Sequence, residues 1–133
     1  MKKINILVVT IITVLFSACL KKAPNYGTCT AYGLSAVTAI NAPDSGFVTD
    51  TIPVKISLQV YNTCGQFAAF IDTAYNGDTT ILSVLTKYDG CTCNNAFPIR
   101  DTIYKFTKPT AGKYFLKFQG TYYNSIIDSI VIH

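Results

Sequence analysis

The sequence is poor in the side chains that most enzymes use for proton transfer. Its 133 residues contain no Glu and no Trp, all seven acidic residues are Asp, and the single His is the last residue, His133. General acid–base catalysis therefore has few candidates, and we expect no catalytic residue. Charged residues make up 14% of the chain and the formal net charge is +4. That balance is too weak for a nucleic-acid partner unless it is clustered, and the lysines are spread along the chain.

Long hydrophobic runs are also scarce, and the clearest one lies at the N-terminus. Met1-Lys2-Lys3 is a short basic start, and residues 4–16 form a mostly apolar run. As a helix this run would reach about 20 Å, whereas a hydrocarbon core is about 30 Å thick. The pattern therefore predicts a secretory signal peptide and not a membrane span.

The residues that follow this run resemble the bacterial lipobox, in the form Phe16-Ser17-Ala18-Cys19. The resemblance implies that residues 1–18 are removed and that Cys19 carries diacylglycerol on its sulfur and an acyl chain on its amine. Such chains are enough for stable membrane anchoring. By the same analogy Leu20 permits passage to the outer membrane, with the protein facing the periplasm or the cell surface. A plain signal peptide beside an incidental Cys is the alternative.

We divide the mature chain into a tether and one domain. Residues 19–33 begin with the lipidated Cys, lack periodicity and contain Pro24, Gly27 and Gly33, which is typical of a linker. Residues 34–133 show no repeat and no second linker. Membrane contact is therefore expected through the anchor, and binding or structural work through the domain.

The domain shows alternation with a period of two residues. Val54, Ile56, Leu58 and Val60 alternate with more polar residues, and residues 113–119 show the same pattern. Weaker patterns, separated by turn residues, predict five more strands, over residues 35–42, 67–75, 79–88, 99–107 and 125–132. Seven short strands with little helix-forming sequence predict an all-β fold, a two-sheet antiparallel sandwich.

The segment Ala111-Gly112-Lys113-Tyr114-Phe115-Leu116 resembles the turn into strand F of immunoglobulin-like domains, with Tyr114 in the place of the tyrosine corner. Leu116 stands where antibody domains have Cys, and the Trp of their strand C is missing. The resemblance is therefore to the broad Ig-like or fibronectin-like sandwich, as found in many small lipoproteins of the Bacteroidota. It implies no activity, because this fold serves many functions.

Four cysteines remain once Cys19 is assigned to lipid: Cys29, Cys64, Cys91 and Cys93. An even number in a chain that leaves the cytoplasm predicts disulfides. Strands of alternating direction place all four at the end where the tether enters. A bridge between Cys91 and Cys93 would be strained, so we expect Cys29 to pair with one of them and Cys64 with the other. The sequence leaves both pairings open.

Metal and nucleophilic roles for these cysteines are less well supported. The Cys-x-Cys spacing of Cys91 and Cys93 is not the pair typical of zinc sites, and a copper site would lack Met or His support. A Cys–His enzyme is not expected, because strand alternation places His133 at the opposite end of the domain. The Asp72 to Asp78 segment lacks the ligand pattern of a calcium loop. We expect no metal and no cofactor.

Aromatic residues are plentiful, with nine Tyr and eight Phe. Most are expected in the core or in cross-strand pairs. Tyr61 and Phe115, however, fall on the polar phase of their strands, and Tyr122-Tyr123 lie in the last turn. We interpret these four as a recognition surface for a protein or a glycan. The favoured function is a lipid-anchored binding module without catalytic activity, the alternative is a structural or assembly component of an envelope complex, and a small envelope enzyme is least favoured.

Overall fold

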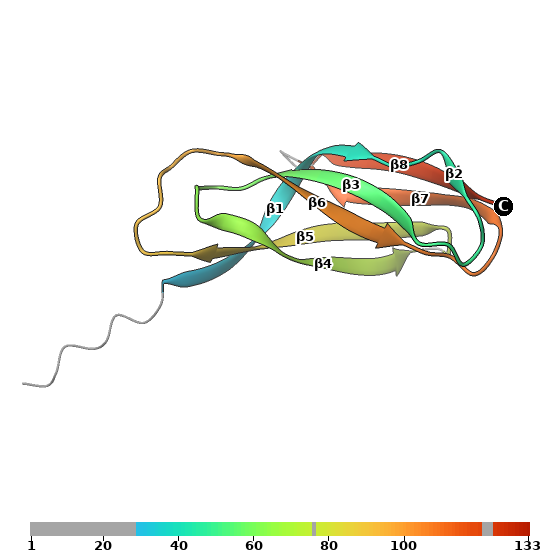
Figure 1. The fold of residues 1–133 in the computed structure, drawn as a ribbon, viewed down its shortest axis with the longest axis horizontal. Helices are drawn as coiled ribbons and strands as arrows, with labels where there is room; N and C mark the ends of the chain where they lie inside the picture. The colour runs from blue at the N-terminus through green and yellow to red at the C-terminus, as the bar shows by residue number, and fades with distance from the viewer. Residues whose placement is uncertain (1–28, 76, 121–123) are drawn as a thin grey trace, which may run out of the picture.

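The computed structural model describes residues 29–75, 77–120 and 124–133 (Figure 1). These residues form strands joined by turns and loops, without a helix, which confirms the predicted all-β class. None of the described residues forms a helix long and apolar enough to span a membrane. The strands are β1 (Thr30–Asn41), β2 (Ser45–Gly46), β3 (Ile52–Gln59), β4 (Gly65–Tyr75), β5 (Thr79–Asp89), β6 (Ile99–Phe106), β7 (Gly112–Gln119) and β8 (Ser125–Ile132).

The described residues form eight strands, so the prediction of seven was wrong. The additional strand, β2, lies inside the segment that was predicted as a turn, and Ser45–Gly46 pairs in parallel with the end of β8. Two residues are too few to show alternation in the sequence. The predicted strand over residues 35–42 also begins earlier, at Thr30, because Thr30–Ser35 pairs with Val84–Asp89. Residues 30–33, assigned above to the tether, therefore belong to the sheet.

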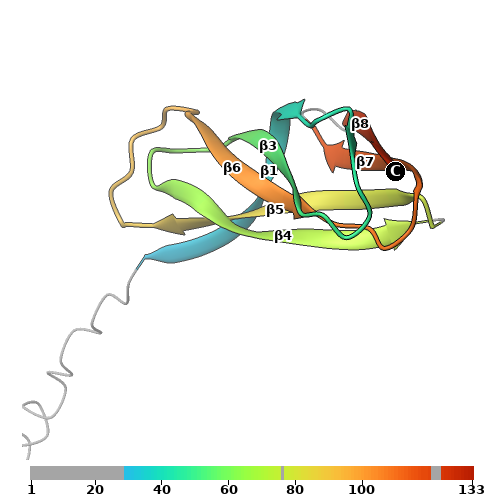
Figure 2. The same ribbon diagram turned by 45° about the vertical axis from the view of Figure 1, so that its right-hand side comes forward.

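All eight strands belong to one hydrogen-bonded sheet that curls into a half-barrel. The order is β2-β8-β7-β5-β1-β3-β6, with β4 on the free side of β5. Figures 1 and 2 show that this sheet folds over itself into two packed layers. We call β3, β6 and the second half of β1 the front wall, and β4, β5, β7, β8, β2 and the first half of β1 the back wall.

Strand β1 makes the corner between the two walls. Its first half, Thr30–Ser35, pairs with β5, and its second half, Ala36–Asn41, pairs with β3. The register with β3 shifts between Val37 and Ala39. Such irregularities bend a strand and increase its twist. The bend lets one strand belong to both walls.

Two pairings are parallel, so the prediction of an entirely antiparallel sandwich was wrong. Thr79–Leu82 of β5 runs parallel to Phe115–Phe118 of β7, and β2 runs parallel to β8. The chain leaves β5, crosses to the front wall as β6 and returns as β7. Two reversals give β5 and β7 the same direction, and they pair in parallel because they are neighbours.

The core fills the space between the two walls. The predicted inward aliphatic residues of β3, Val54, Ile56 and Leu58, are fully buried, as is the adjoining Val60. Burying each such side chain stabilises the fold by about 1.5–3 kcal/mol. The buried apolar residues that meet them are Val37, Ile52, Leu82, Val84, Phe106, Tyr114, Leu116, Phe118, Ile130 and Ile132.

Tyr114 contacts the turn that precedes β7. Its side chain is buried, and its hydroxyl donates a hydrogen bond to the Thr110 carbonyl at 3.0 Å. The same oxygen lies 2.7 Å from Thr110 Oγ1. These contacts hold the turn that carries the chain from the front wall into β7.

The two ends of the sandwich are chemically different. Figure 1 shows that β1 begins at one end of the long axis and that the chain terminates at the other. At the second end, His133 donates its backbone N–H to the Gly46 carbonyl and accepts a hydrogen bond from the Val48 N–H, each at 3.0 Å. All four described cysteines lie at the first end, which leaves the only His far from them.

Candidate functional site

Two disulfides join three segments at the end where β1 begins. Cys29 is bonded to Cys91, and Cys64 is bonded to Cys93. The bonds connect the start of β1, the β3–β4 loop and the β5–β6 loop. The predicted disulfides are confirmed, and the structure selects one of the two pairings that the sequence left open.

Gly90 lies directly against this disulfide pair. Its φ is +146°, and an added Cβ would lie 3.0 Å from Cys64 Sγ and 3.4 Å from Cys93 Sγ. Its N–H donates to the Cys29 carbonyl at 2.9 Å. Only glycine suits this position, because both the backbone conformation and the close approach of sulfur exclude a side chain.

The β3–β4 loop is held in place by hydrogen bonds from β6 and from the β5–β6 loop. The Arg100 guanidinium donates to the Gly65 carbonyl at 3.2 Å and to the Thr63 carbonyl at 3.1 Å. Asn94 accepts from the Thr63 N–H and donates its own N–H to Thr63 Oγ1, both at 3.1 Å. Together with the Cys64–Cys93 bond, these contacts make a rigid rim.

A pocket of about 430 Å³ lies beside this rim. The rings of Tyr61 and Tyr88 stack in it with centroids 6.1 Å apart and planes at 30°. Tyr61 is 59% exposed, so it stands at the mouth. The lining contains no Asp, Glu, Lys, Arg or His. The pocket is lined by Cys29, Thr30, Ala31, Tyr61, Asn62, Tyr88, Gly90 and Cys93.

Tyr88 is positioned from the core side of the pocket. Its ring packs on Gly65, where an added Cβ would lie only 2.8 Å from Tyr88 Cε1. Its hydroxyl accepts a hydrogen bond from the Tyr61 N–H at 3.2 Å and lies 3.5 Å from Ser35 Oγ. Ser35 Oγ in turn accepts from Thr86 Oγ1 at 2.6 Å, within the core. These hydrogen bonds hold the Tyr88 ring in place, while the Tyr61 ring remains accessible to solvent.

Asn62 and Thr30 supply the polar side chains of the pocket. The side-chain oxygen of Asn62 accepts a hydrogen bond from the Cys64 N–H at 3.0 Å, which fixes the amide and leaves its nitrogen as the group it can offer a ligand. Thr30 Oγ1 donates to Asp89 Oδ1 at 3.0 Å and retains lone pairs for accepting. The pocket thus combines aromatic surface with hydrogen-bonding groups of both kinds.

The structure separates the residues that were predicted as one recognition surface. Tyr61 lies in the pocket, whereas Phe115 lies on the outer surface of the back wall, 37% exposed, with Lys113 Nζ 5.4 Å from its ring centroid. Phe115 is exposed on β7, whereas Tyr61 lies beyond the end of β3, so the strand phase that was assigned to Tyr61 does not apply to it. Cys19, Tyr122 and Tyr123 lie outside the described residues.

Sequence reasoning missed Tyr88, Asn62 and Gly90. Tyr88 ends a predicted strand, and its ring points to the inner side, so nothing local distinguishes it from a core aromatic. Gly90 lies between the predicted strands over residues 79–88 and 99–107, where the sequence indicated only turn residues. The one available signal was the proximity of both segments to Cys64 and Cys91 in the chain, since the predicted disulfides bring these positions to one end.

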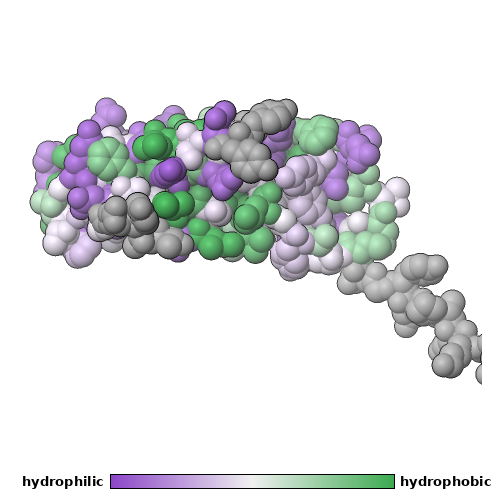
Figure 3. Space-filling view, turned by 180° about the vertical axis from the view of Figure 1, so that it is seen from behind, coloured by the Kyte–Doolittle hydropathy of each residue, from purple (hydrophilic) through white to green (hydrophobic). Residues whose placement is uncertain are grey.

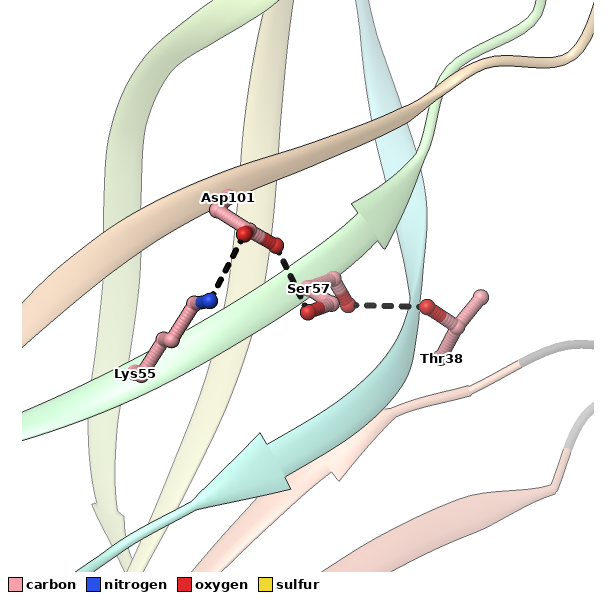
Figure 4. Close-up of polar contacts among 4 residues, drawn as sticks. All are labelled: Thr38, Lys55, Ser57 and Asp101. Carbon is pink, nitrogen blue, oxygen red and sulfur yellow. Dashed lines mark hydrogen bonds and ion pairs between the residues drawn. The ribbon is translucent and has the colours of Figure 1, made fainter.

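A polar network lies on the outer surface of the front wall, away from the pocket (Figure 4). Thr38 Oγ1 donates to the Ser57 carbonyl at 3.1 Å, and Ser57 Oγ donates to Asp101 Oδ1 at 2.7 Å. Lys55 Nζ lies 2.8 Å from Asp101 Oδ2. Hydrogen bonds from Lys55 and then Ser57 hold the pKa of Asp101 below its ordinary value. The ion pair is exposed on both sides, so solvent screens it, and it resembles a surface contact more than a reactive site.

Tyr104 of β6 closes the gap between the free edges of β6 and β4. Its ring meets Phe70 edge to face with centroids 5.1 Å apart, and its hydroxyl donates to Asp72 Oδ2 at 3.4 Å. Burial first, and then the Asp72 charge, raise the pKa of Tyr104 to about 12. The phenol therefore stays protonated at neutral pH, and its contacts with Phe70 and Asp72 join β6 of the front wall to β4 of the back wall.

Taken together, the fold and the site define a disulfide-bonded β-sandwich domain with a small neutral pocket at one end. Among the described residues, no group of three or more His, Cys, Asp or Glu side chains could hold a metal ion. The family model of the ORF11 beta-sandwich domain matches residues 54–127, more than half of the chain. The chain belongs to this family, which confirms the sandwich. No curated protein and no solved structure matches it.

Proposed function

We propose that this protein is a binding module of the bacterial cell envelope, without catalytic activity, and that its ligand site is the Tyr61–Tyr88 pocket. The observation that carries the proposal is the pocket itself: two stacked rings beside a rim held by two disulfides. Its volume of about 430 Å³ falls in the usual range for small-molecule sites. The tyrosine corner at Tyr114 supports kinship with Ig-like domains, although the parallel β5–β7 pairing departs from them.

The proposed anchor is lipid on Cys19, which would place the protein at the outer membrane. The basic start, the apolar run over residues 4–16 and the position of Cys19 support it. Two disulfides fit a compartment outside the reducing cytoplasm. The chain enters the domain at the disulfide end, so the pocket would lie on the side that faces the anchor (Figure 1).

A neutral sugar is the ligand class that suits the pocket best. A sugar ring has an apolar face that can lie on an aromatic ring, and its hydroxyls donate and accept hydrogen bonds. Tyr61 offers an exposed ring, while Asn62 and Thr30 offer a donor and an acceptor. The uncharged lining favours an uncharged ligand, because an ion would lose hydration without gaining a partner.

The proposal is tested by titrating the protein with neutral methyl glycosides and following saturation transfer by NMR. Tyr61→Ala should weaken binding about five- to thirtyfold, the effect of removing an aromatic contact worth about 1–2 kcal/mol. Tyr32→Ala is the matched control, because Tyr32 is similarly exposed, at 62%, but lies on the outer surface of the back wall and does not line the pocket. It should leave affinity unchanged.

The result that contradicts the proposal is equally specific. Binding that is insensitive to Tyr61→Ala, in a variant that keeps the wild-type thermal midpoint, would place the ligand elsewhere. Preference for an ionised sugar over its neutral counterpart would contradict the assignment of ligand class but leave the pocket as a binding site.

A further inference from the structure

The outer surface of the back wall is apolar over several adjacent strands. We call this surface the back face. Its exposed apolar side chains come from β1, β4, β7 and β8. Figure 3 shows hydrophobic residues gathered in the middle of the molecule when it is seen from behind. Monomeric proteins rarely expose large contiguous apolar surfaces without a partner. The exposed members are Tyr32, Leu34, Ile71, Phe115 and Ile127, between 37% and 62% exposed.

Strand register shows that the part of the back face nearer the disulfide end is continuous. Leu34 of β1 and Ala69 of β4 both lie opposite Leu85 of β5, on its two sides. Ile71 lies opposite Ser83, the next outward residue of β5. Directly opposite residues of antiparallel strands have Cβ atoms about 4.5–5.5 Å apart. The four apolar side chains therefore form one surface.

The same surface continues across the parallel pairing. Lys117 of β7 lies opposite Ile81 of β5 on one side and opposite Ile127 of β8 on the other. Phe115 is the neighbouring outward residue of β7. β7 and the first half of β1 pair with successive parts of one edge of β5, β4 pairs with its other edge, and β8 lies beyond β7. With about 20 Å of each of these five strands in use and a width of about 4.8 Å per strand, the face measures roughly 500 Å². A partner that covers this face would bury about 1,000 Å² in total, counting the surfaces of both proteins, which is the lower limit for a specific protein interface.

The charges on the back face have one predominant sign. Lys113 and Lys117 point outward from β7, and Lys87 points outward from β5. Among the described outward residues of these strands the only carboxylate is Asp89, which already pairs with Lys87 at 2.8 Å. Lys113 stands beside Phe115. The apolar surface and its excess of lysines are therefore complementary to an apolar surface that carries carboxylates.

We propose that the back face docks a second protein, whose contact surface is apolar and flanked by Asp or Glu side chains. A second copy of this chain does not fit, because it would bring Lys113 and Lys117 of both copies together without carboxylates to pair them. A bilayer fits less well, because the strands that carry the back face run along the long axis, whereas β1 begins at one end of that axis (Figure 1). The proposal is independent of the sugar pocket, which lies at that end.

The test uses the full chain in the cells that normally produce it, with the photo-crosslinking residue p-benzoylphenylalanine in place of Ile127. The matched control places it at Ile103, which is 59% exposed against 60% for Ile127 but lies on the front wall. We expect a protein adduct from position 127 that position 103 does not give. The crosslinked peptide, identified by mass spectrometry, should contain apolar and acidic residues.

Charge reversal decides whether the lysines take part. Lys113→Glu combined with Lys117→Glu should reduce the adduct roughly tenfold, in a variant whose thermal midpoint matches wild type. An adduct with a second copy of the chain, with lipid alone, or with a protein regardless of charge reversal would each overturn the proposal. So would the same adduct from both positions, or no adduct from position 127 when the protein is fully folded.

Discussion

Single side chains determine how the turns and the pocket of this domain are shaped. The Tyr114 hydroxyl donates to the Thr110 carbonyl and so holds the turn into β7. The Tyr88 hydroxyl accepts a hydrogen bond from the Tyr61 backbone N–H and so positions Tyr61. The Tyr114 hydroxyl bonds to a carbonyl four residues earlier, across a turn. The Tyr88 hydroxyl bonds to a residue 27 positions away, which is close only in the folded chain. Buried polar atoms of this kind cost free energy when they lose a partner. They are therefore positions where removing one oxygen has a measurable effect.

Tyr114→Phe should lower the free energy of unfolding by about 1–2 kcal/mol, because the Thr110 carbonyl loses its donor while the ring still fills the core. Urea denaturation followed by fluorescence or circular dichroism measures this change. Tyr32→Phe serves as the control, since Tyr32 is exposed and should change stability by less than about 0.5 kcal/mol. Equal stability of the two variants would show that the hydrogen bond contributes nothing.

At the level of elements, six of the seven predicted strands lie close to their predicted positions and the seventh, β1, begins earlier. Local alternation located them because β3 and β7 each bury one face. The missed strand, β2, is two residues long and is defined only by its pairing with β8. The loops were harder to predict, because the disulfides and Arg100 organise them through contacts between distant parts of the chain.

The two disulfides should contribute unequally to stability. They close loops with sequence separations of 62 and 29 residues. In the chain-entropy model these loops correspond to about 4.3 and about 3.6 kcal/mol, against a total stability of about 5–15 kcal/mol for a typical domain. Replacing Cys29 and Cys91 by Ala should therefore destabilise at least as much as replacing Cys64 and Cys93, as measured by denaturant unfolding.

A second measurement on the same pair of variants separates stability from site structure. Cys93 lines the pocket and its bond to Cys64 fixes the loop that carries Tyr61. Loss of this bond should weaken glycoside binding even under conditions where the variant is folded. Unchanged affinity in a folded Cys64→Ala/Cys93→Ala variant would mean that the Arg100 and Asn94 contacts suffice to hold the rim.

On the scale of the whole molecule, the proposed anchor, the pocket and the back face occupy different parts of the sandwich. The disulfide end, with the pocket, lies where the chain enters, and the back face runs along the side (Figure 1, Figure 3). A tethered domain in this orientation could hold a small ligand near the anchor and a protein partner at its flank. The two binding events would then be separable by mutation.

Cys19→Ser should release the protein from the membrane fraction, because the thiol that would carry diacylglycerol is gone. Detergent extraction of fractionated cells and intact mass of the purified protein measure the outcome, with acyl mass expected on the wild type only. Ala18→Gly is the control, since it preserves a small residue before Cys19 and should leave anchoring intact. Membrane retention of the Cys19→Ser variant would contradict the lipid anchor.

The amino-acid sequence by itself determined what depends on neighbours along the chain. Alternation in residues 54–60 defined an inward face, and the order of strands and cysteines placed Cys29, Cys64, Cys91 and Cys93 at one end. These properties follow from the two-residue period of a strand and from the reversal of direction at each turn. They required no knowledge of which strands pair.

The tertiary structure alone decided which strands became neighbours. It bent β1 across both walls, set β5 parallel to β7, and brought Tyr88 against Tyr61. It also placed Leu34, Ile71 and Phe115 on one surface, although their strands lie far apart in sequence. The physical reason is that pairing and packing minimise the free energy of the whole chain, whereas the alternation pattern of a strand reports only which of its faces is buried.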